Sequence, residues 1–471
     1  MQMKKTVKRV LFILVLGGLG YGIYYCSISF PIISGYGAKN MCSAVFLANR
    51  NEAEVRAQEL GFGPMKLGTF KVDYSDSSVT GSVFGFAKCK AIYRKGLGAT
   101  LVNEIAEKEL RSQHFQMANL PVINPDTVAW PVGNKINLPP EYSSNSGFPK
   151  EIDPSKLQQA IQHIFTEKDT LKPIRTRAVL ILYDGNIIAE QYAPGFTKNT
   201  RLLGWSMTKS VTSALIGILV KNKQLTVEAP APVPEWKDEK DTRHAITLKD
   251  ILQQNSGLSF VEDYGKSSDA TKMLFEKADM GAYTASHPLK DKPGSVFYYS
   301  SGNTNMLSRI IKQTVGEKMY HAFPYDSLFY PLGMYSAVME PDGSGTFVGS
   351  SYMYATARDW ARFGLLYLNK GVCNGKRILT EDWIQQSITP VATAEKGDYG
   401  FQFWLNAGAK NNPNNKEYPS APNDLYYMDG YEGQRVFIIP SKKMVIVRLG
   451  LTQHHNFDQD TFLKEVLGSV K

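Results

Sequence analysis

Residues 202–220 read LLGWSMTKSVTSALIGILV, and this stretch decides the fold of the chain. Ser206 and Lys209 lie three positions apart, and an apolar run begins directly after them. On a helix, that spacing brings both side chains to one face within mutual reach. The stretch therefore predicts a buried helix whose first turn carries a serine hydroxyl beside a lysine amine.

The position of this pair suggests a chemistry. The N-terminal end of a helix favours a developing alkoxide and disfavours an ammonium group. Burial also disfavours the charged form of lysine, so we expect an uncharged Lys209 to take the proton of Ser206. Such an activated nucleophile needs no histidine. The simpler alternative is a helix-capping serine beside a solvated lysine.

Tyr299 lies in a second segment of interest, GSVFYYSSGNTNMLSRII at 294–311. Small polar residues and a helical run follow it, so we expect a turn that enters a helix. A phenol at that turn would face a cleft and relay protons. Packing is the alternative role, because the chain has 25 tyrosines and most of them must be packing residues.

A third segment, YYMDGYEGQRVFIIP at 426–440, leads into the last strands. Its glycines, Gly430 and Gly433, would let the backbone come close to a ligand. An edge strand there would give one N–H group to an oxyanion, and Ser206 would give the other. The alternative is an ordinary glycine turn.

Strands are expected near both ends of the large domain. Residues 177–193 predict a hairpin that turns at Asp184-Gly185, and residues 435–451 predict a strand pair broken at Pro440. Helices are expected between these segments. The pattern indicates an α/β (α+β) fold, with one central sheet assembled from distant segments and an all-helical subdomain beside it.

The order Ser-x-x-Lys, Tyr-x-(Asn or Ser) and a glycine-containing strand resembles the serine β-lactamase and penicillin-binding-protein superfamily. The segments 246–258 (ITLKDILQQNSGL), 356–364 (TARDWARFG) and 374–383 (NGKRILTEDW) resemble the class C β-lactamase-like branch, which includes esterases and D-aminopeptidases. The run YSSGNTN at 299–305 is most similar to the 6-aminohexanoate-dimer hydrolases, which open linear amides. The resemblance covers residues 154–455 and implies a β-lactamase/transpeptidase-like fold with an antiparallel central sheet.

The resemblance also implies roles for individual residues. Ser206 would be the nucleophile, Lys209 its base and Tyr299 the proton carrier to the leaving group. The backbone N–H groups of Ser206 and Tyr431 would form the oxyanion hole, with Gln434 in place of Tyr431 if the register is shifted. The expected substrate contacts are Ser301, Asp263, Tyr264, Gly430, Gly433 and Gln434. We expect no metal and no cofactor, because CxxC, HExxH and Cys/His clusters are absent from the sequence.

Departures from the family pattern bear on the substrate. Penicillin-recognising members carry Tyr-x-Asn, whereas Ser301 holds the third position here. They carry Lys-Thr-Gly on the sheet edge, where residues 428–430 are Met-Asp-Gly. That lysine normally holds a substrate carboxylate, which methionine and aspartate cannot do. Neutral or cationic amides and esters are therefore the expected small-molecule substrates.

The sequence thus predicts a serine hydrolase that cleaves an amide or ester bond through an acyl-enzyme on Ser206. A penicillin-binding-protein-like peptidase or a β-lactamase is the first alternative, and an inactive binding module on the same fold is the second. A Ser-His-Asp enzyme is disfavoured because the Gly-x-Ser-x-Gly elbow is missing. His454 and His455 are expected at the surface.

The N-terminus predicts a membrane partner. An apolar run at 10–25 follows Lys4, Lys5, Lys8 and Arg9, and with its flanks it approaches the roughly 20 residues that span a bilayer. The basic residues would stay cytoplasmic, which places the catalytic domain on the extracytoplasmic side. An uncleaved anchor is favoured because an A-x-A site is not evident, and a cleaved signal peptide is the alternative.

The expected organisation has four parts: a basic stub and anchor at 1–38, a small α+β domain at 39–122, a proline-rich linker at 123–152 and the hydrolase domain at 153–471. In the small domain, a strand is expected over 42–48, with a helix from Asn51. Cys42 and Cys89 would form a disulfide or remain buried thiols. The formal charge of +9 comes from scattered residues and no nucleic-acid module appears, so nucleic acid is not an expected partner.

Overall fold

The computed structural model describes residues 2–137, 148–453 and 457–471. The chain divides into two compact units, Met1–Ser112 with Val261–Ala278 and Gln113–Phe260 with Asp279–Lys471. His454, His455 and part of the expected linker lie outside the described residues.

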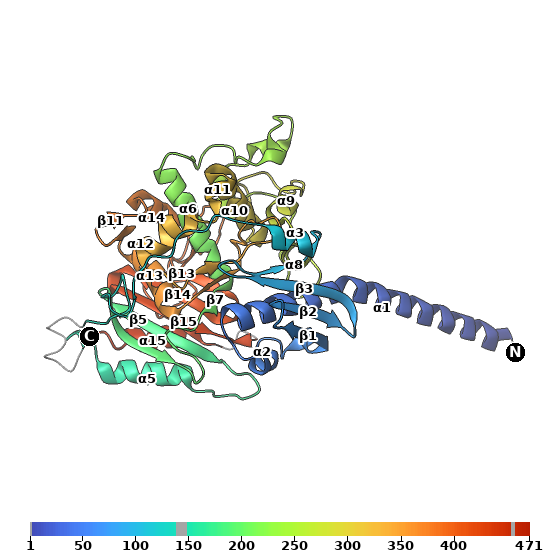
Figure 1. Cartoon of the computed structure of the whole chain (residues 1–471), viewed down its shortest axis with the longest axis horizontal. Helices are drawn as coiled ribbons and strands as arrows, with labels where there is room; N and C mark the ends of the chain where they lie inside the picture. The colour runs from blue at the N-terminus through green and yellow to red at the C-terminus, as the bar shows by residue number, and fades with distance from the viewer. Residues whose placement is uncertain (1, 138–147, 454–456) are drawn as a thin grey trace. The chain divides into compact units, whose positions relative to one another are not determined.

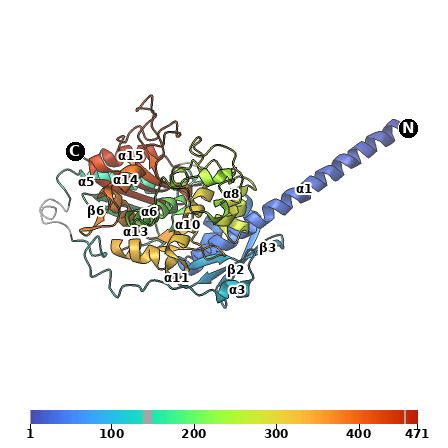
Figure 2. The same ribbon diagram turned by 90° about the horizontal axis from the view of Figure 1, so that it is seen from above.

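The first unit combines one long helix with a four-stranded sheet (Figure 1). The helix α1 (Gln2–Cys42) packs its C-terminal part against the sheet and extends beyond it, as both views show (Figure 1, Figure 2). The antiparallel order is β1-β2-β3-β4. The strands are β1 (Gly68–Asp73), β2 (Ser78–Val83), β3 (Phe86–Arg94) and β4 (Gly98–Leu101). The short helices are α2 (Glu52–Gln58), η2 (Gly63–Leu67), α3 (Glu107–Ser112) and α8 (Asp269–Glu276).

Two expectations for this unit have clear outcomes. The strand expected over 42–48 is wrong, because η1 (Ser43–Leu47) is a helical turn that continues α1. Its apolar residues are buried, and a short apolar run does not distinguish a buried helix from a strand. Cys42 and Cys89 are both free thiols, and their sulfurs donate to the oxygens of Ala91 and Asn103 respectively.

The second unit is built on a six-stranded antiparallel sheet in the order β12-β13-β14-β15-β5-β6. The strands are β5 (Thr176–Tyr183), β6 (Asn186–Tyr192), β12 (Trp404–Leu405), β13 (Tyr426–Gly430), β14 (Gln434–Ile439) and β15 (Met444–Gly450). Strand β15 pairs directly with β5 although more than 250 residues separate them, for example Met444 with Tyr183. The predicted sheet assembled from distant segments is confirmed.

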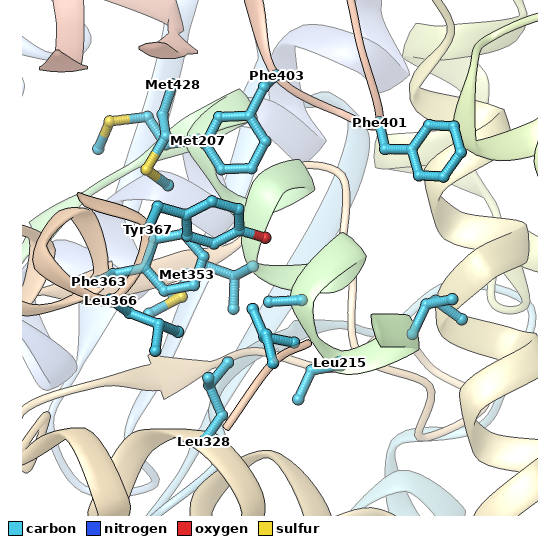
Figure 3. Close-up of a cluster of buried hydrophobic side chains, with 14 of the residues drawn as sticks. Met207, Leu215, Leu328, Met353, Phe363, Leu366, Tyr367, Phe401, Phe403 and Met428 are labelled. Carbon is cyan, nitrogen blue, oxygen red and sulfur yellow. The ribbon is translucent and has the colours of Figure 1, made fainter. Parts of the chain in front are cut away.

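Helices cover both faces of this sheet because its strands are apolar on both sides. On one face lie α5 (Pro154–Phe165), opened by the side chain of Asp153, and α15 (Gln459–Leu467). On the other lie α6 (Thr208–Lys221) and α13 (Ala357–Leu368). Figure 3 shows part of that core, in which Met207, Leu215 and Met428 belong to the same cluster as Phe363 and Tyr367 of α13. Replacing a buried leucine such as Leu215 with alanine would lower the free energy of unfolding by about 2–5 kcal/mol.

Short strands and further helices, of which α10 is the longest, make up the rest of the second unit. A three-stranded sheet in the order β7-β9-β8 consists of β7 (Leu202–Leu203), β8 (Val338–Met339) and β9 (Met353–Ala355), and β10 (Val372–Cys373) pairs with β11 (Lys376–Arg377). The remaining helices are η3 (Trp205–Met207), η4 (Pro234–Trp236), η5 (Thr242–Ala245), α7 (Leu248–Leu252), α9 (Met280–Ala285), α10 (Ser301–Val315), α11 (Glu317–Tyr320), η6 (Tyr325–Phe329), α12 (Tyr330–Leu332), α14 (Glu381–Ser387), η7 (Tyr431–Gly433) and η8 (Pro440–Lys442).

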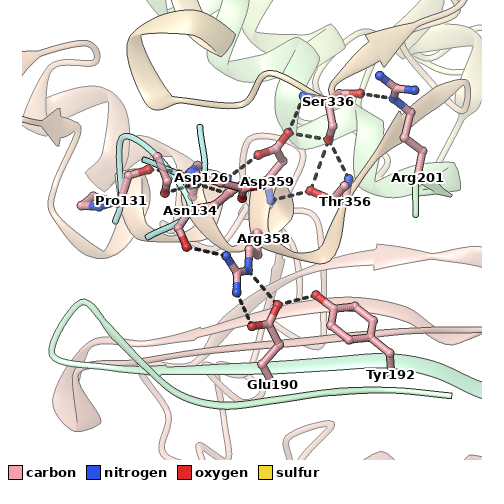
Figure 4. A network of polar contacts seen from close by, with 12 residues as sticks. Asp126, Pro131, Asn134, Glu190, Tyr192, Arg201, Ser336, Thr356, Arg358 and Asp359 are labelled. Carbon is pink, nitrogen blue, oxygen red and sulfur yellow. Dashed lines mark hydrogen bonds and ion pairs between the residues drawn. The ribbon is translucent and has the colours of Figure 1, made fainter. Parts of the chain in front are cut away.

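Two arginines of α13 hold the proline-rich segment against the rest of the second unit. Figure 4 shows the contacts of one of them, Arg358. Arg358 forms a two-pronged ion pair with Glu190 of β6, at 2.7 and 2.6 Å, and donates to the carbonyl of Asn134. Arg362 donates to the carbonyls of Pro131 and Gly133. The TARDWARFG motif therefore contributes a clamp on the segment that precedes the hydrolase domain.

Candidate active site

Ser206 lies in a tight turn between strand β7 and helix α6. The amide of Gly204 donates to the carbonyl of Met353 at 2.9 Å, which ties the turn to strand β9. Trp205 has φ of 48°, an unusual backbone conformation for a bulky residue. Such strain persists where surrounding packing enforces it, and here the Trp205 side chain is 8% exposed. The result is a half-buried Ser206 held at the mouth of a buried helix.

Lys209 is 1% exposed and its amine reaches three oxygens. The Nζ atom lies 3.1 Å from Ser206 Oγ, 3.0 Å from Ser301 Oγ and 3.0 Å from the Ser350 carbonyl oxygen. An ammonium group would donate to all three. A neutral amine would donate to Ser301 and Ser350 and turn its lone pair toward the Ser206 hydroxyl. The three-residue spacing thus brings the two groups together, as the sequence predicted.

The oxygen partners of Lys209 are themselves held in place. The amide of Ser350 donates to Asn305 Oδ1 at 3.1 Å, which fixes the carbonyl that faces the lysine. Ser301 is the first residue of helix α10, whose cap is Ser300. Ser350 was missed by sequence reasoning, because a backbone carbonyl leaves no signal in the residue type.

A pair of buried glutamines supports the start of α10. Gln254 Oε1 accepts from the amide of Ser300 at 3.1 Å and from Nδ2 of Asn303 at 2.8 Å. Its amide nitrogen donates to Gln402 Oε1 at 3.3 Å. Sequence reasoning quoted Gln254 only as part of the motif at 246–258, and it missed Gln402 altogether. These residues position Ser301 rather than contact Ser206.

Tyr299 lies beside the same amine. Its ring centroid is 4.9 Å from Lys209 Nζ, and the ring packs against Trp404 and Tyr399 with centroids 5.4 and 6.0 Å away. This tyrosine therefore packs against aromatic neighbours and also lies beside the lysine amine. Its role as a proton carrier stays a prediction.

The end of strand β13 lies against the turn that carries Ser206. A Cβ atom on Gly430 would lie 2.2 Å from the carbonyl oxygen of Gly204, so this approach requires glycine. The ring of Tyr431 meets that of Trp205 edge-on with centroids 5.7 Å apart. The backbone N–H of Tyr431 stays a predicted oxyanion donor.

Gln434 and Gly433 shape the turn that follows Tyr431. The Gln434 side-chain amide donates to the carbonyls of Tyr431 and Gly450, and its oxygen accepts from the amide of Gly450. Gly433 has φ of 82°, and a Cβ atom there would lie 2.6 Å from Nη1 of Arg448. These contacts make both residues supports of the turn, and their role as substrate contacts stays a prediction.

The residues at the position of the family's Lys-Thr-Gly offer no cation. Met428 is fully buried in the core near Met207 (Figure 3). Asp429 forms an ion pair with Arg435, whose guanidinium also donates to the carbonyls of Gly430 and Gln434. Arg435 itself is 8% exposed. This part of the strand therefore lacks an open positive charge for a substrate carboxylate.

Asp263 and Tyr264 belong to the first compact unit. The Asp263 carboxylate accepts from the amide of Gly265 and pairs with Lys266, while the Tyr264 hydroxyl donates to Glu262. The hydrogen bonds of the Gly265 amide and Lys266 lower the pKa of Asp263. Their expected contact with substrate stays a prediction.

The chain is similar to known proteins in both sequence and fold. The family model described as Beta-lactamase matches residues 161–465. A 6-aminohexanoate-dimer hydrolase from Paenarthrobacter ureafaciens is 23% identical over an alignment of 298 residues, and the match covers 58% of this chain and 72% of that protein.

Solved structures are similar in fold. A family VIII carboxylesterase superposes with a TM-score of 0.54 at 14% identity, over 68% of this chain and 97% of the esterase. A penicillin-binding protein homologue from Caulobacter crescentus gives a TM-score of 0.54 at 17% identity, over 69% of this chain and 98% of the homologue. At these identities the likeness shows the fold alone.

Proposed function

This chain belongs to the beta-lactamase family of serine hydrolases, and we propose that it cleaves an amide or ester bond through an acyl-enzyme on Ser206. One observation carries the proposal. The amine of the buried Lys209 lies 3.1 Å from the Ser206 hydroxyl, within the range of a nucleophile and its base.

The reaction follows from the three groups around the lysine. Neutral Lys209 accepts the Ser206 proton while its own N–H groups donate to Ser301 and the Ser350 carbonyl. Ser206 Oγ bonds to the substrate carbonyl carbon, and the oxyanion accepts hydrogen bonds from the N–H groups of Ser206 and Tyr431. The proton passes through Tyr299 to the leaving amine or alcohol as its bond breaks. Water then attacks the acyl carbon, and one of its protons passes to Ser206 Oγ as the acyl bond breaks, which releases the acid and restores the serine hydroxyl.

The substrate class we propose is a neutral or cationic amide or ester. The absence of an open cation at Met428 and Asp429 supports this choice over β-lactams and D-alanyl peptides, whose carboxylate needs a positive partner. The curated relative described as a 6-aminohexanoate-dimer hydrolase makes linear amides a sensible first test.

Active-site labelling tests the proposal. The wild type should react with a fluorophosphonate probe and turn over p-nitrophenyl esters or linear amides, whereas Ser206→Ala should do neither. Ser286→Ala, an exposed serine at the end of α9, is the matched control and should behave as wild type. Equal labelling of Ser206→Ala and wild type would remove Ser206 from its role.

The alternatives have their own outcomes in the same assay. A wild type that neither labels nor turns over any substrate of a panel would favour the inactive binding module. Covalent capture of labelled penicillin at Ser206, faster than turnover of simple amides and esters, would favour the peptidase or β-lactamase.

We also propose that α1 anchors the protein in a membrane with the hydrolase on the extracytoplasmic side. Among the described residues, α1 is the one helix long and apolar enough to span a bilayer, and its apolar window is not buried against the protein. The basic residues before it favour a cytoplasmic N-terminus. Retention in the membrane pellet after carbonate extraction is the expected result, and release into the supernatant would contradict it.

A further inference from the structure

We propose that the tip of the β2–β3 hairpin inserts into the same bilayer as α1 and forms a second membrane contact of the first unit. The proposal rests on the membrane anchor proposed above. The hairpin tip contacts the extracytoplasmic face of the phospholipid bilayer.

Large apolar side chains gather at one end of the small sheet. Phe84 and Phe86 are 67% and 69% exposed, and Leu67 is 46% exposed. They belong together because Gly68, which follows Leu67, pairs with Val83, and Val83 pairs with Phe86. Contiguous exposed apolar side chains of this kind mark an interaction surface on a folded unit.

The turn itself is unusual for a water-exposed hairpin. Phe84 and Gly85 connect the strands with φ of 50° and 82°. Two-residue turns with two positive φ values normally carry Asn, Asp or Gly at the first position, since a bulky side chain is strained there. Phe84 thus combines backbone strain with exposure of a phenyl ring to water. Both are offset if the ring enters an apolar phase.

The position of α1 indicates that the apolar phase around Phe84 is the bilayer. A Cβ atom on Gly81 would lie 2.3 Å from the carbonyl oxygen of Ser34, so β2 runs directly along the helix. Three residues further, the Phe84 ring contacts Phe30 of α1 with centroids 6.1 Å apart. The hairpin tip therefore lies where α1 leaves the small sheet.

The length of the apolar span places the bilayer edge at the same level. A helix that spans a bilayer has roughly 20 residues. If the span begins after the last basic residue, Arg9, it ends next to Phe30. Large apolar side chains of α1 from Val7 to Tyr25 are exposed throughout. The hairpin tip and the outer end of the span thus reach a common plane.

Basic residues flank the exposed aromatic tip. Lys66 precedes Leu67 and Lys88 lies two positions after Phe86, and both side chains are exposed. Cations at this level attract anionic lipid headgroups, while the aromatic rings enter the interface. Tyr74, at the opposite end of β1, is equally exposed and provides an internal comparison.

Hydrophobic photolabelling tests the contact in the full-length chain. The protein is reconstituted in vesicles of phosphatidylcholine and phosphatidylglycerol, and a membrane-partitioned phenyl diazirine is photolysed. Mass spectrometry then maps the labelled residues. We expect label on Phe84 and Phe86 as well as on α1, and little on Tyr74. The double variant Phe84→Ser, Phe86→Ser should lose the hairpin label and keep the α1 label, and Tyr74→Ser should match wild type.

The outcomes separate this inference from the anchor. Label on α1 with no more label on residues 83–86 than on Tyr74 would overturn the hairpin contact and leave the anchor intact. A wild type without label on α1 would overturn the anchor and the inference that rests on it. Neither result depends on the variants folding, and ester hydrolysis by Ser206 is measured separately.

Discussion

The carbonyl oxygen of Gly204 occupies the space that a side chain at position 430 would need, because a Cβ atom there would lie 2.2 Å from it. Strand β13 and the turn that carries Ser206 are therefore in direct backbone contact. Gly430 fixes the distance between the nucleophile and the turn expected to supply the second oxyanion amide.

Gly430→Ala should push β13 away from the Ser206 turn, because the clash is with backbone and cannot be relieved by a side-chain rotation. Displacement of a catalytic group by about 1 Å can cost about 100-fold in rate, so we expect kcat to fall by about that factor. Steady-state kinetics with a p-nitrophenyl ester measures it. Gly22→Ala in the exposed part of α1 is the control, because an added Cβ there would meet nothing within 4 Å. Equal loss of kcat in both variants would contradict the argument.

Ser301→Ala removes one of the three oxygens around the Lys209 amine. A lost hydrogen bond to a charged or ionisable group costs about 1.5–3 kcal/mol, which corresponds to roughly 10- to 150-fold in kcat. KM should change little, because the interaction orients the base. Thr314→Ala on the same helix, where the hydroxyl returns to the Ile310 carbonyl, should keep wild-type kcat. A change confined to KM would instead assign Ser301 to substrate binding.

The ion pair between Arg358 and Glu190 should contribute more to the free energy of unfolding than to catalysis. Both side chains are largely buried, at 6% and 14% exposure, so removing one partner leaves a buried charge. Arg358→Met should lower the free energy of unfolding by about 3–5 kcal/mol. The double variant Arg358→Met, Glu190→Leu should recover part of that loss. Urea unfolding of the wild type, the two single variants and the double variant measures this recovery. Strictly additive losses would show that the two residues act independently.

Asp342 should make stability depend on pH. Its carboxylate accepts from the amides of Met280, Ser344 and Thr346 and from the Ser344 hydroxyl. Burial nevertheless raises the pKa of Asp342 from 3.8 to about 7. The folded state then holds the proton more tightly than the unfolded state, so this contribution to stability is fully present below pH 4 and is lost as pH rises through 7.

Unfolding experiments between pH 4 and pH 8 measure this effect. The free energy of unfolding of the wild type should fall relative to that of Asp342→Asn as pH rises through this window. Asp382→Asn, at an exposed position of α14, is the control and should show a constant difference. A pH-independent difference for Asp342→Asn would mean that the carboxyl is ionised throughout.

Local sequence signals predicted the elements whose causes are local. The Asp184-Gly185 turn predicted the β5–β6 hairpin. The spacing of Ser206 and Lys209 predicted their contact, because helical geometry alone brings residues three apart together.

Contacts that depend on the tertiary fold could not be predicted in the same way. The Ser350 carbonyl reaches Lys209 from 141 positions away, and Gln254 meets Gln402 across 148 positions. The turn at 43–47 has the composition of a strand, yet it continues α1 because its apolar residues are buried in the helical conformation. Local propensity yields to such packing.

Helix α1 passes from its exposed apolar part into its packed part without a loop between them. A protease needs an extended stretch of chain, and this junction offers none while the helix is intact. If α1 is the anchor, shedding of the protein from the cell surface would first require local unwinding near the small sheet. Any tilt of the helix within the bilayer would likewise pass to the first unit through a continuous helix, in which Pro31, lacking a backbone N–H group, is the point that can bend.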